Sequence, residues 1–178
     1  MVKTSVRHIK PKVFISPGGS GVPNTVRLMV LTEVAGAKGL PVETFDCTQI
    51  RNPEIRIKSL LESGVLDGER PILVGSSMGG YVSTVVAEKH EVEGLFLLSP
   101  ALYVPPYENQ APQPKAKFIV VVHGRQDDIV PPENIRRFAR RFGADLHLLP
   151  GGHSLDGQLP EIRTLFSRFL DACLQTVS

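Results

Sequence analysis

In the stretch Pro71-Ile-Leu-Val-Gly-Ser-Ser-Met-Gly-Gly80, an apolar run leads into a Gly-x-Ser-x-Gly motif and then into a segment with helical character. This succession of strand, tight turn and helix is the context that a nucleophile elbow requires. Such a turn strains the backbone of its central serine and leaves no room for side chains two positions away, which suits Gly75 and Gly79. The stretch therefore predicts that the Ser77 hydroxyl is held up at the C-terminal edge of a sheet.

Apolar strand-like runs alternate with helix-like segments along the chain. The runs at 72–74, 95–98 and 119–122 are continuously apolar. A strand that is apolar on both faces is covered on both faces, which is typical of a parallel sheet between helices. We therefore predict a three-layer, doubly wound α/β fold with a mostly parallel sheet of about six strands. The predicted strands are 12–16, 42–46, 72–75, 94–99, 118–123 and 145–149, and the predicted helices are 24–36, 54–63, 78–89, 132–142 and 160–174.

The length and composition fit a soluble globular protein. The 178 residues predict a single domain over residues 1–178, large enough to bury a core without disulfides. Hydrophobic residues make up 42% and the net charge is +2, which favours neither disorder nor a nucleic-acid partner. No apolar run approaches the roughly 18 residues of a membrane-spanning helix, so we expect no membrane partner.

The N-terminal segment and the cysteines indicate a cytoplasmic protein. The apolar run Val13-Phe-Ile is too short for the core of a signal peptide. Cys47 and Cys173 stand in no redox or zinc spacing, which is typical of free thiols in a reducing compartment. No histidine or carboxylate pair stands at ligand spacing, so we expect neither a metal nor a cofactor. The oligomeric state is not predicted.

A serine nucleophile needs a base within hydrogen-bond reach and an acid that orients the base. After a nucleophile elbow these partners follow in the order Ser, acid, His. Asp127 lies just past the apolar run 118–122, at the strand end where doubly wound proteins place their sites. Asp127 is preferred and Asp128 is the alternative acid. A lone aspartate in such a position can also be a plain turn residue, but that interpretation is weaker here because the strand, the serine and the histidine agree. His153, behind two glycines after the last strand, is the predicted base, whereas His123 precedes the acid.

An oxyanion hole needs two backbone N–H groups aimed at the developing negative charge. The N–H of Met78, the residue after the nucleophile, is the first candidate. The second comes from the loop Ser16-Pro-Gly-Gly-Ser-Gly21, in which Pro17 has no N–H, so Gly18 is preferred and Gly19 is next. Such a loop can instead cradle a phosphate, but this one lacks both a Lys-Ser/Thr ending and the G-x-G-x-x-G pattern.

Three segments, in order and at predicted strand ends, resemble the α/β-hydrolase superfamily in its small, lidless, esterase-like form. The elbow is Gly75-Ser-Ser-Met-Gly79. Residues 123–131 match the pattern His-Gly-x-x-Asp-x-x-Val-Pro, and residues 152–154 match Gly-His-Ser/Arg/Ala. The resemblance extends over about residues 13–174 and implies a fold without a cap domain and a triad of Ser77, Asp127 and His153.

The chain departs from this family at Ser16-Pro17, where relatives usually have His-Gly. The assignment of Gly18 to the oxyanion hole is therefore not carried over from the family. The two N-terminal strands of larger relatives also have no counterpart, unless Ser5–Ile9 forms a short edge strand.

The activity expected from these residues is that of a serine hydrolase that cleaves a small ester or thioester through an acyl-serine intermediate. The substrate would be a small acyl compound, and the pocket candidates are Gly19, Tyr103 and Tyr107. The two tyrosines lie in the proline-rich loop 100–115 and either line the pocket or cover the core. Two other functions remain open: a non-catalytic binding or interaction protein on the same fold, and acyltransferase or amidase chemistry on the same triad.

Overall fold

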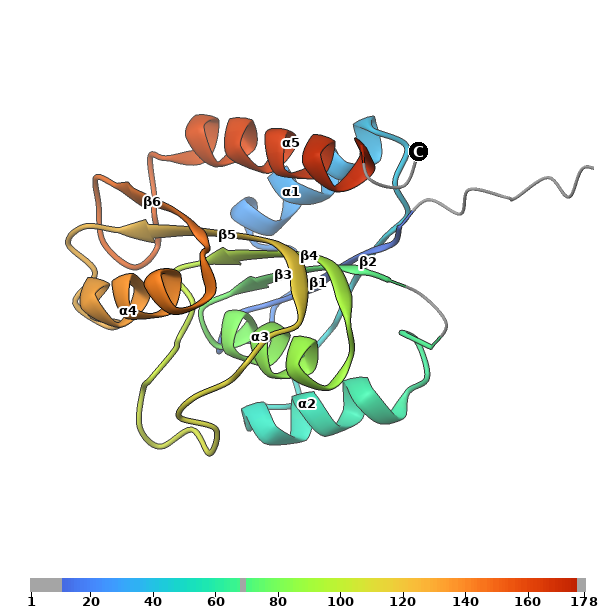
Figure 1. The fold of residues 1–178 in the computed structure, drawn as a ribbon, viewed down its shortest axis with the longest axis horizontal. Helices are drawn as coiled ribbons and strands as arrows, with labels where there is room; N and C mark the ends of the chain where they lie inside the picture. The colour runs from blue at the N-terminus through green and yellow to red at the C-terminus, as the bar shows by residue number, and fades with distance from the viewer. Residues whose placement is uncertain (1–10, 68–69, 176–178) are drawn as a thin grey trace, which may run out of the picture.

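Six parallel strands form one sheet in the computed structural model, which describes residues 11–67 and 70–175 (Figure 1). The order across the sheet is β2-β1-β3-β4-β5-β6, and every neighbouring pair is parallel. The predicted three-layer α/β fold is thus confirmed, while the possible edge strand Ser5–Ile9 lies outside the described residues. The strands are β1 (Val13–Ser16), β2 (Val42–Thr44), β3 (Ile72–Ser76), β4 (Val92–Leu98), β5 (Ala116–Gly124) and β6 (Asp145–Leu149).

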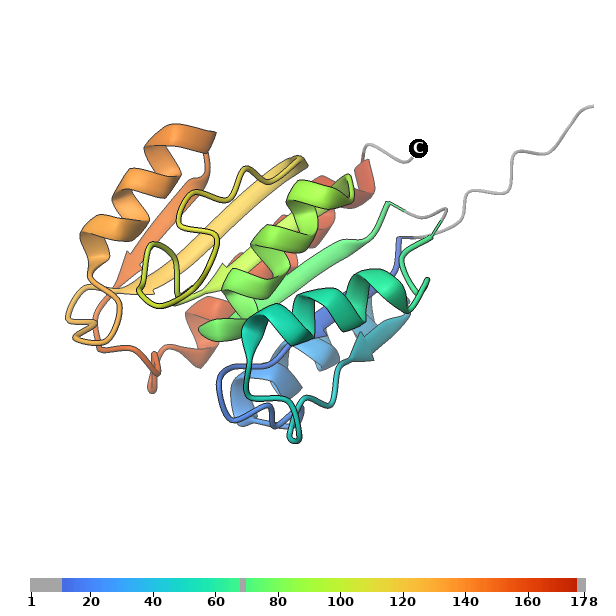
Figure 2. The same cartoon turned by 90° about the horizontal axis from the view of Figure 1, so that it is seen from below.

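Helices cover both faces of the sheet. Figures 1 and 2 show that one group of helices lies on one face and the remaining helices lie on the other. The first pair is α1 (Val26–Ala37) and α5 (Leu159–Gln175), and the second group is α2 (Pro53–Glu62), α3 (Met78–Lys89) and α4 (Pro132–Phe142). No described helix combines the length and the apolar character needed to cross a bilayer.

Alternate residues of each strand contribute to two separate hydrophobic cores, because successive side chains of a strand point to opposite faces of the sheet. Val13 and Ile15 of β1 pack with α1 and α5, whereas Phe14 packs with the helices on the other face. The same division runs through the central strands, where Phe96 joins the first core and Leu95 the second. This two-sided burial explains why the central strands are continuously apolar in the sequence.

The chain reverses its direction of travel across the sheet next to β1. It runs from β1 outward to β2, returns to β3 on the other side of β1, and then continues to β6. In open α/β sheets, such a switch point opens a crevice beyond the carboxyl ends of the strands. Here Ser16 at the end of β1 pairs with Gly75 of β3, so the glycine-rich loop after β1 lies beside the elbow after β3.

Helix ends follow the expected local chemistry. Asn52 accepts hydrogen bonds from the N–H groups of Glu54 and Ile55 through its side chain, and Pro53 opens α2. The last helix on that face, α4, begins at Pro132 and ends before Gly143, which has a left-handed φ of 63°. The cap therefore fixes the start of α2, and Arg56 near this end of the helix contacts the loop after β1.

Replacing Phe166 with alanine should reveal how much the α1–α5 core contributes to stability. The Phe166 side chain is fully buried, and its ring centroid lies 4.8 Å from that of Phe96. We expect the free energy of unfolding to fall by about 3–5 kcal/mol, measured by urea denaturation, because a large cavity is left. The matched control is Met29→Ala on α1, where the side chain is 57% exposed. Equal losses in the two variants would contradict this assignment of the core.

Candidate active site

Ser77 occupies a strained position between β3 and α3. Its φ is 53° and its ψ is −117°, outside the regions that residues with a side chain normally adopt. Close backbone approaches explain the glycines on either side. A Cβ on Gly75 would lie 2.3 Å from the carbonyl oxygen of Gly79, and one on Gly79 would lie 2.1 Å from that of Ser16. The elbow therefore packs main chain against main chain.

Three side chains that are far apart in sequence form a continuous hydrogen-bonded chain. The His153 Nε2 atom lies 2.8 Å from Ser77 Oγ, and His153 Nδ1 lies 2.8 Å from Asp127 Oδ2. They come from the elbow after β3, the loop after β5 and the loop after β6. The structure thus brings together the serine, the acid and the histidine that the sequence pointed to. In this hydrogen-bonded arrangement, Nε2 of His153 can accept the proton of Ser77 while Nδ1 donates to the carboxylate of Asp127.

The carboxylate of Asp127 is fully buried and saturated with donors. Its Oδ1 atom accepts hydrogen bonds from the N–H groups of Ile129 and Val130, at 3.0 and 2.9 Å. Its Oδ2 atom faces His153. The neighbouring Asp128 is exposed. Of the two candidate acids, only Asp127 contacts the histidine, and its turn bonds hold the carboxylate in one orientation.

The loop after β6, which carries His153, is hydrogen-bonded to the loop after β5 and to α1. The N–H of Gln126 donates to the carbonyl of Gly151, while the Gln126 side chain accepts from the N–H of the same glycine. On the other side, Arg27 Nη1 lies 3.4 Å from the carbonyl oxygen of His153. Arg27 was not singled out from the sequence, because an arginine within a helix carries no distinguishing pattern.

His123 is a further residue at this site that the sequence did not assign. It is fully buried, and its Nε2 atom lies 3.0 Å from the carbonyl oxygen of Val130 and 3.3 Å from Asp127 Oδ2. Burial lowers the pKa of His123, although the bond to Val130 and the nearby carboxylate oppose that shift. A neutral imidazole with its proton on Nε2 therefore donates toward both oxygens.

The candidate oxyanion groups lie next to the serine. Met78 is the first residue of α3, where backbone N–H groups have no partner within the helix. Gly18 approaches from the loop after β1: a Cβ built on it would lie 3.7 Å from Ser77 Cβ. A Cβ built on Gly19 would lie 3.9 Å from the tip of the Met78 side chain. Proximity to Ser77 thus favours Gly18 over Gly19.

The two pocket candidates from the 100–115 loop pack on the protein body. The Tyr107 ring lies 4.6 Å from that of Tyr81, and the Tyr103 ring lies beneath Arg137 at 4.4 Å. Both tyrosines adjoin the core on the α2–α3–α4 face. Covering the core, one of the two roles left open by the sequence, is therefore observed for both. Contact with a substrate remains a prediction.

Comparisons with known proteins agree with this architecture. The profile of an uncharacterised protein family (UPF0227) matches residues 55–117. A solved structure from Xanthomonas campestris pv. campestris, assigned to the α/β superfamily of hydrolases, is 25% identical with a TM-score of 0.80, and the match covers 91% of this chain and 99% of that one. A comparison with curated proteins gave no match.

Two further solved structures share the fold. Est1E from Butyrivibrio proteoclasticus is 18% identical with a TM-score of 0.77, and the match covers 93% of this chain and 88% of Est1E. An α/β serine hydrolase homologue from Coxiella burnetii is 23% identical with a TM-score of 0.73, over 89% of this chain and 83% of that one. These two likenesses show that the fold is shared.

Titration of His123 provides a test of the buried acid environment. Because burial lowers its pKa, an NMR titration should give a midpoint below the ordinary histidine value of about 6.5. His123 then binds a proton more readily in the unfolded chain than in the folded one. The contribution of the neutral His123 to the free energy of unfolding is therefore complete above about pH 6.5, and it is lost as the pH falls through the lower pKa of the folded state. His123→Gln, which retains a donor, should remove this part of the pH dependence. A midpoint above 6.5 would contradict the prediction.

Proposed function

We propose that this chain, whose fold matches that of an α/β-superfamily hydrolase, is a serine hydrolase that cleaves a small ester or thioester through an acyl-serine intermediate. The observation that carries this proposal is the unbroken chain from Ser77 Oγ through His153 to Asp127, with 2.8 Å at each link. A nucleophile and base in hydrogen-bond contact, with the base oriented by a buried carboxylate, is the arrangement that acyl transfer requires.

In the proposed reaction, His153 Nε2 takes the proton of Ser77 as Oγ bonds to the carbonyl carbon. Asp127 orients the imidazole and stabilises the imidazolium. The N–H groups of Met78 and Gly18 would bind the negative oxygen. When the carbonyl re-forms, the bond to the alcohol or thiol breaks, and His153 protonates that leaving group. His153 then deprotonates a water that attacks the acyl-serine, so the acid is released and the serine recovers its proton.

We further propose a short acyl group, or an ester on a larger carrier, as the substrate. The connection between β4 and β5 spans residues 99–115 and is bonded to the protein body: the N–H of Asn109 donates to the Tyr81 hydroxyl, and the N–H of Gln113 donates to Glu88. A connection held in this way is a fixed wall at the rim. Long-chain lipids call instead for a deep apolar cavity.

The proposed location is the cytoplasm. Cys47 and Cys173 are both buried and form no disulfide, and burial raises the pKa of the Cys173 thiol to about 12. Cysteines that stay protonated and outside disulfides fit a reducing compartment.

Ser77→Ala should abolish hydrolysis of p-nitrophenyl acetate, because the variant has no nucleophile. The same change should abolish covalent labelling by a fluorophosphonate probe, detected by mass spectrometry on residue 77. Ser154→Ala serves as the control, since the hydroxyl of this exposed serine beside the base donates to Asp156 and not to the proposed triad. Wild-type turnover in Ser77→Ala would refute the assignment, and an unlabelled wild-type protein would favour a non-catalytic role. A panel of esters, thioesters and amides would then separate the remaining chemistries.

Asp127→Asn should lower kcat by about 10⁴, because the amide holds the wrong tautomer of the histidine. Asp128→Asn is the matched control one residue away, with an exposed side chain, and should retain activity. Initial rates with the same ester substrate measure both. A large loss in Asp128→Asn with little loss in Asp127→Asn would reverse the assignment of the acid.

A further inference from the structure

Arg56 is a buried cation whose partners are main-chain carbonyls. It lies on α2 with 4% of its surface exposed. Its Nη1 atom donates to the carbonyls of Pro17 and Gly18, at 3.0 and 2.8 Å, and Nη2 lies 3.3 Å from that of Gly19. Its Nε donates to Ile50 at 2.7 Å. Among the described residues, no carboxylate forms an ion pair with it. Burying a charge in this way is costly unless every donor is used.

We propose that Arg56 is the positioning residue that shapes the oxyanion hole, an inference that rests on the serine hydrolase activity proposed above. A trans peptide is planar, so its C=O and N–H point in opposite directions. When the carbonyl of Pro17 points to the guanidinium, the N–H of Gly18 must point away from it. The same holds for the carbonyl of Gly18 and the N–H of Gly19.

The side away from Arg56 is the side of the nucleophile. Gly18 lies against the elbow, with the position of its absent Cβ 3.7 Å from Ser77 Cβ and 3.5 Å from the carbonyl oxygen of Ser76. The proposal therefore places the guanidinium and Ser77 on opposite sides of this segment of the loop. When Arg56 holds the carbonyls of Pro17 and Gly18 on its own side, the N–H groups of Gly18 and Gly19 face the other side. That is the side on which the oxyanion of an intermediate bonded to Ser77 would form.

The loop has few other means of keeping this orientation. It contains no strand or helix between Ser16 and Val26, Pro17 has no N–H to anchor, and glycines are conformationally free. Within the loop, the N–H of Gly21 also donates to the carbonyl of Gly18, and the carbonyl of Gly21 accepts from the N–H of Cys47. The carbonyl of Pro17, which shares its peptide with the N–H of Gly18, accepts from Arg56. The rigid planar fork of an arginine can bind adjacent oxygens at once, which a lysine ammonium cannot do in the same geometry.

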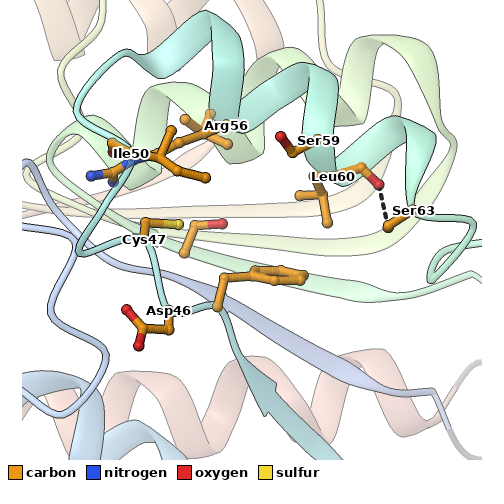
Figure 3. A pocket seen from close by; sticks show the side chains of 10 residues that line it. Asp46, Cys47, Ile50, Arg56, Ser59, Leu60 and Ser63 are labelled. Atoms are coloured by element: carbon orange, nitrogen blue, oxygen red, sulfur yellow. Dashed lines mark hydrogen bonds between the residues drawn. The ribbon is translucent and has the colours of Figure 1, made fainter.

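A cavity beside Arg56 makes the proposal testable by chemical rescue. Figure 3 shows the cavity between α2 and the segment that carries Asp46 and Cys47. Its volume is about 140 Å³. The residues that line it are Ser16, Phe45, Asp46, Cys47, Ile50, Arg56, Ser59, Leu60, Ser63 and Val82. Truncating Arg56 would enlarge this space enough to admit a free guanidinium ion.

The experiment compares Arg56→Ala, Arg56→Lys and the control Lys58→Ala, whose side chain is 73% exposed on the same helix. With p-nitrophenyl acetate, both Arg56 variants should lose about 10² in kcat, the effect of one oxyanion donor. Their KM should stay near the wild-type value because the loss falls on the transition state. Guanidinium chloride, well below denaturing concentrations, should restore part of kcat in Arg56→Ala but none in Ser77→Ala. Lys58→Ala should behave as wild type.

A readout independent of activity separates the two proposals. Amide hydrogen exchange should accelerate at Gly18–Gly21 in Arg56→Ala and stay unchanged in β3 and β4. Wild-type kcat in folded Arg56→Ala, or exchange that accelerates throughout the sheet, would overturn the role of Arg56 while leaving the hydrolase assignment intact. A wild-type protein that neither turns over esters nor labels at Ser77 would refute the hydrolase, and with it an oxyanion role for Arg56, whatever the exchange result.

Discussion

The site depends on one close contact between two stretches of main chain. The elbow after β3 presses against the end of β1, so that a Cβ on Gly79 would lie 2.1 Å from the carbonyl oxygen of Ser16. A side chain at that position would have to push the two strand ends apart. Because β1 and β3 are neighbours at the switch point of the sheet, this contact places the glycine-rich loop beside Ser77. Everything proposed for the oxyanion hole rests on that proximity.

A second constraint is the burial of Asp127. An ionised carboxylate is costly to remove from water unless several donors replace the lost solvent. Two backbone N–H groups of its own turn meet one oxygen, and imidazole nitrogens of His153 and His123 lie at the other. The turn residues that satisfy the charge also fix its direction, so the orientation of His153 is set before any substrate binds. In the proposed mechanism, this fixed orientation would supply the preorganisation that electrostatic catalysis requires.

The sequence predicted the order of elements and the three central side chains because each has a local signature. Continuous apolar runs mark the central strands, and the elbow is a short motif with a steric cause. The predicted ends of the strands were less accurate, as β4 shows. It begins at Val92 and not at the predicted Gly94. An acidic residue in a sequence suggests exposure to solvent, but Glu93 is buried beside Lys117 and Arg70.

Arg56, Arg27 and His123 could not be assigned from sequence for a different reason. The donors of Arg56 bind carbonyl oxygens, which every residue carries and which therefore leave no pattern. Arg27 likewise contacts a carbonyl. His123 was visible within the acid motif, yet its role depends on the way the turn folds back over it. Hydrogen bonds from side chains to backbone carbonyls are thus the part of the site that the sequence could not predict.

The start of α2 links both walls of the site. Arg56 holds the loop after β1, while Glu54, two residues earlier, accepts hydrogen bonds from the Tyr81 hydroxyl at 2.8 Å and from the N–H of Glu108 at 3.2 Å. The Tyr81 hydroxyl in turn accepts from Asn109. One capped helix end therefore holds the loop after β1 on one side and the β4–β5 connection on the other. In a fold without a cap domain, this shared anchor lets two irregular loops serve as rigid walls, because neither can shift without breaking bonds to the same turn of helix.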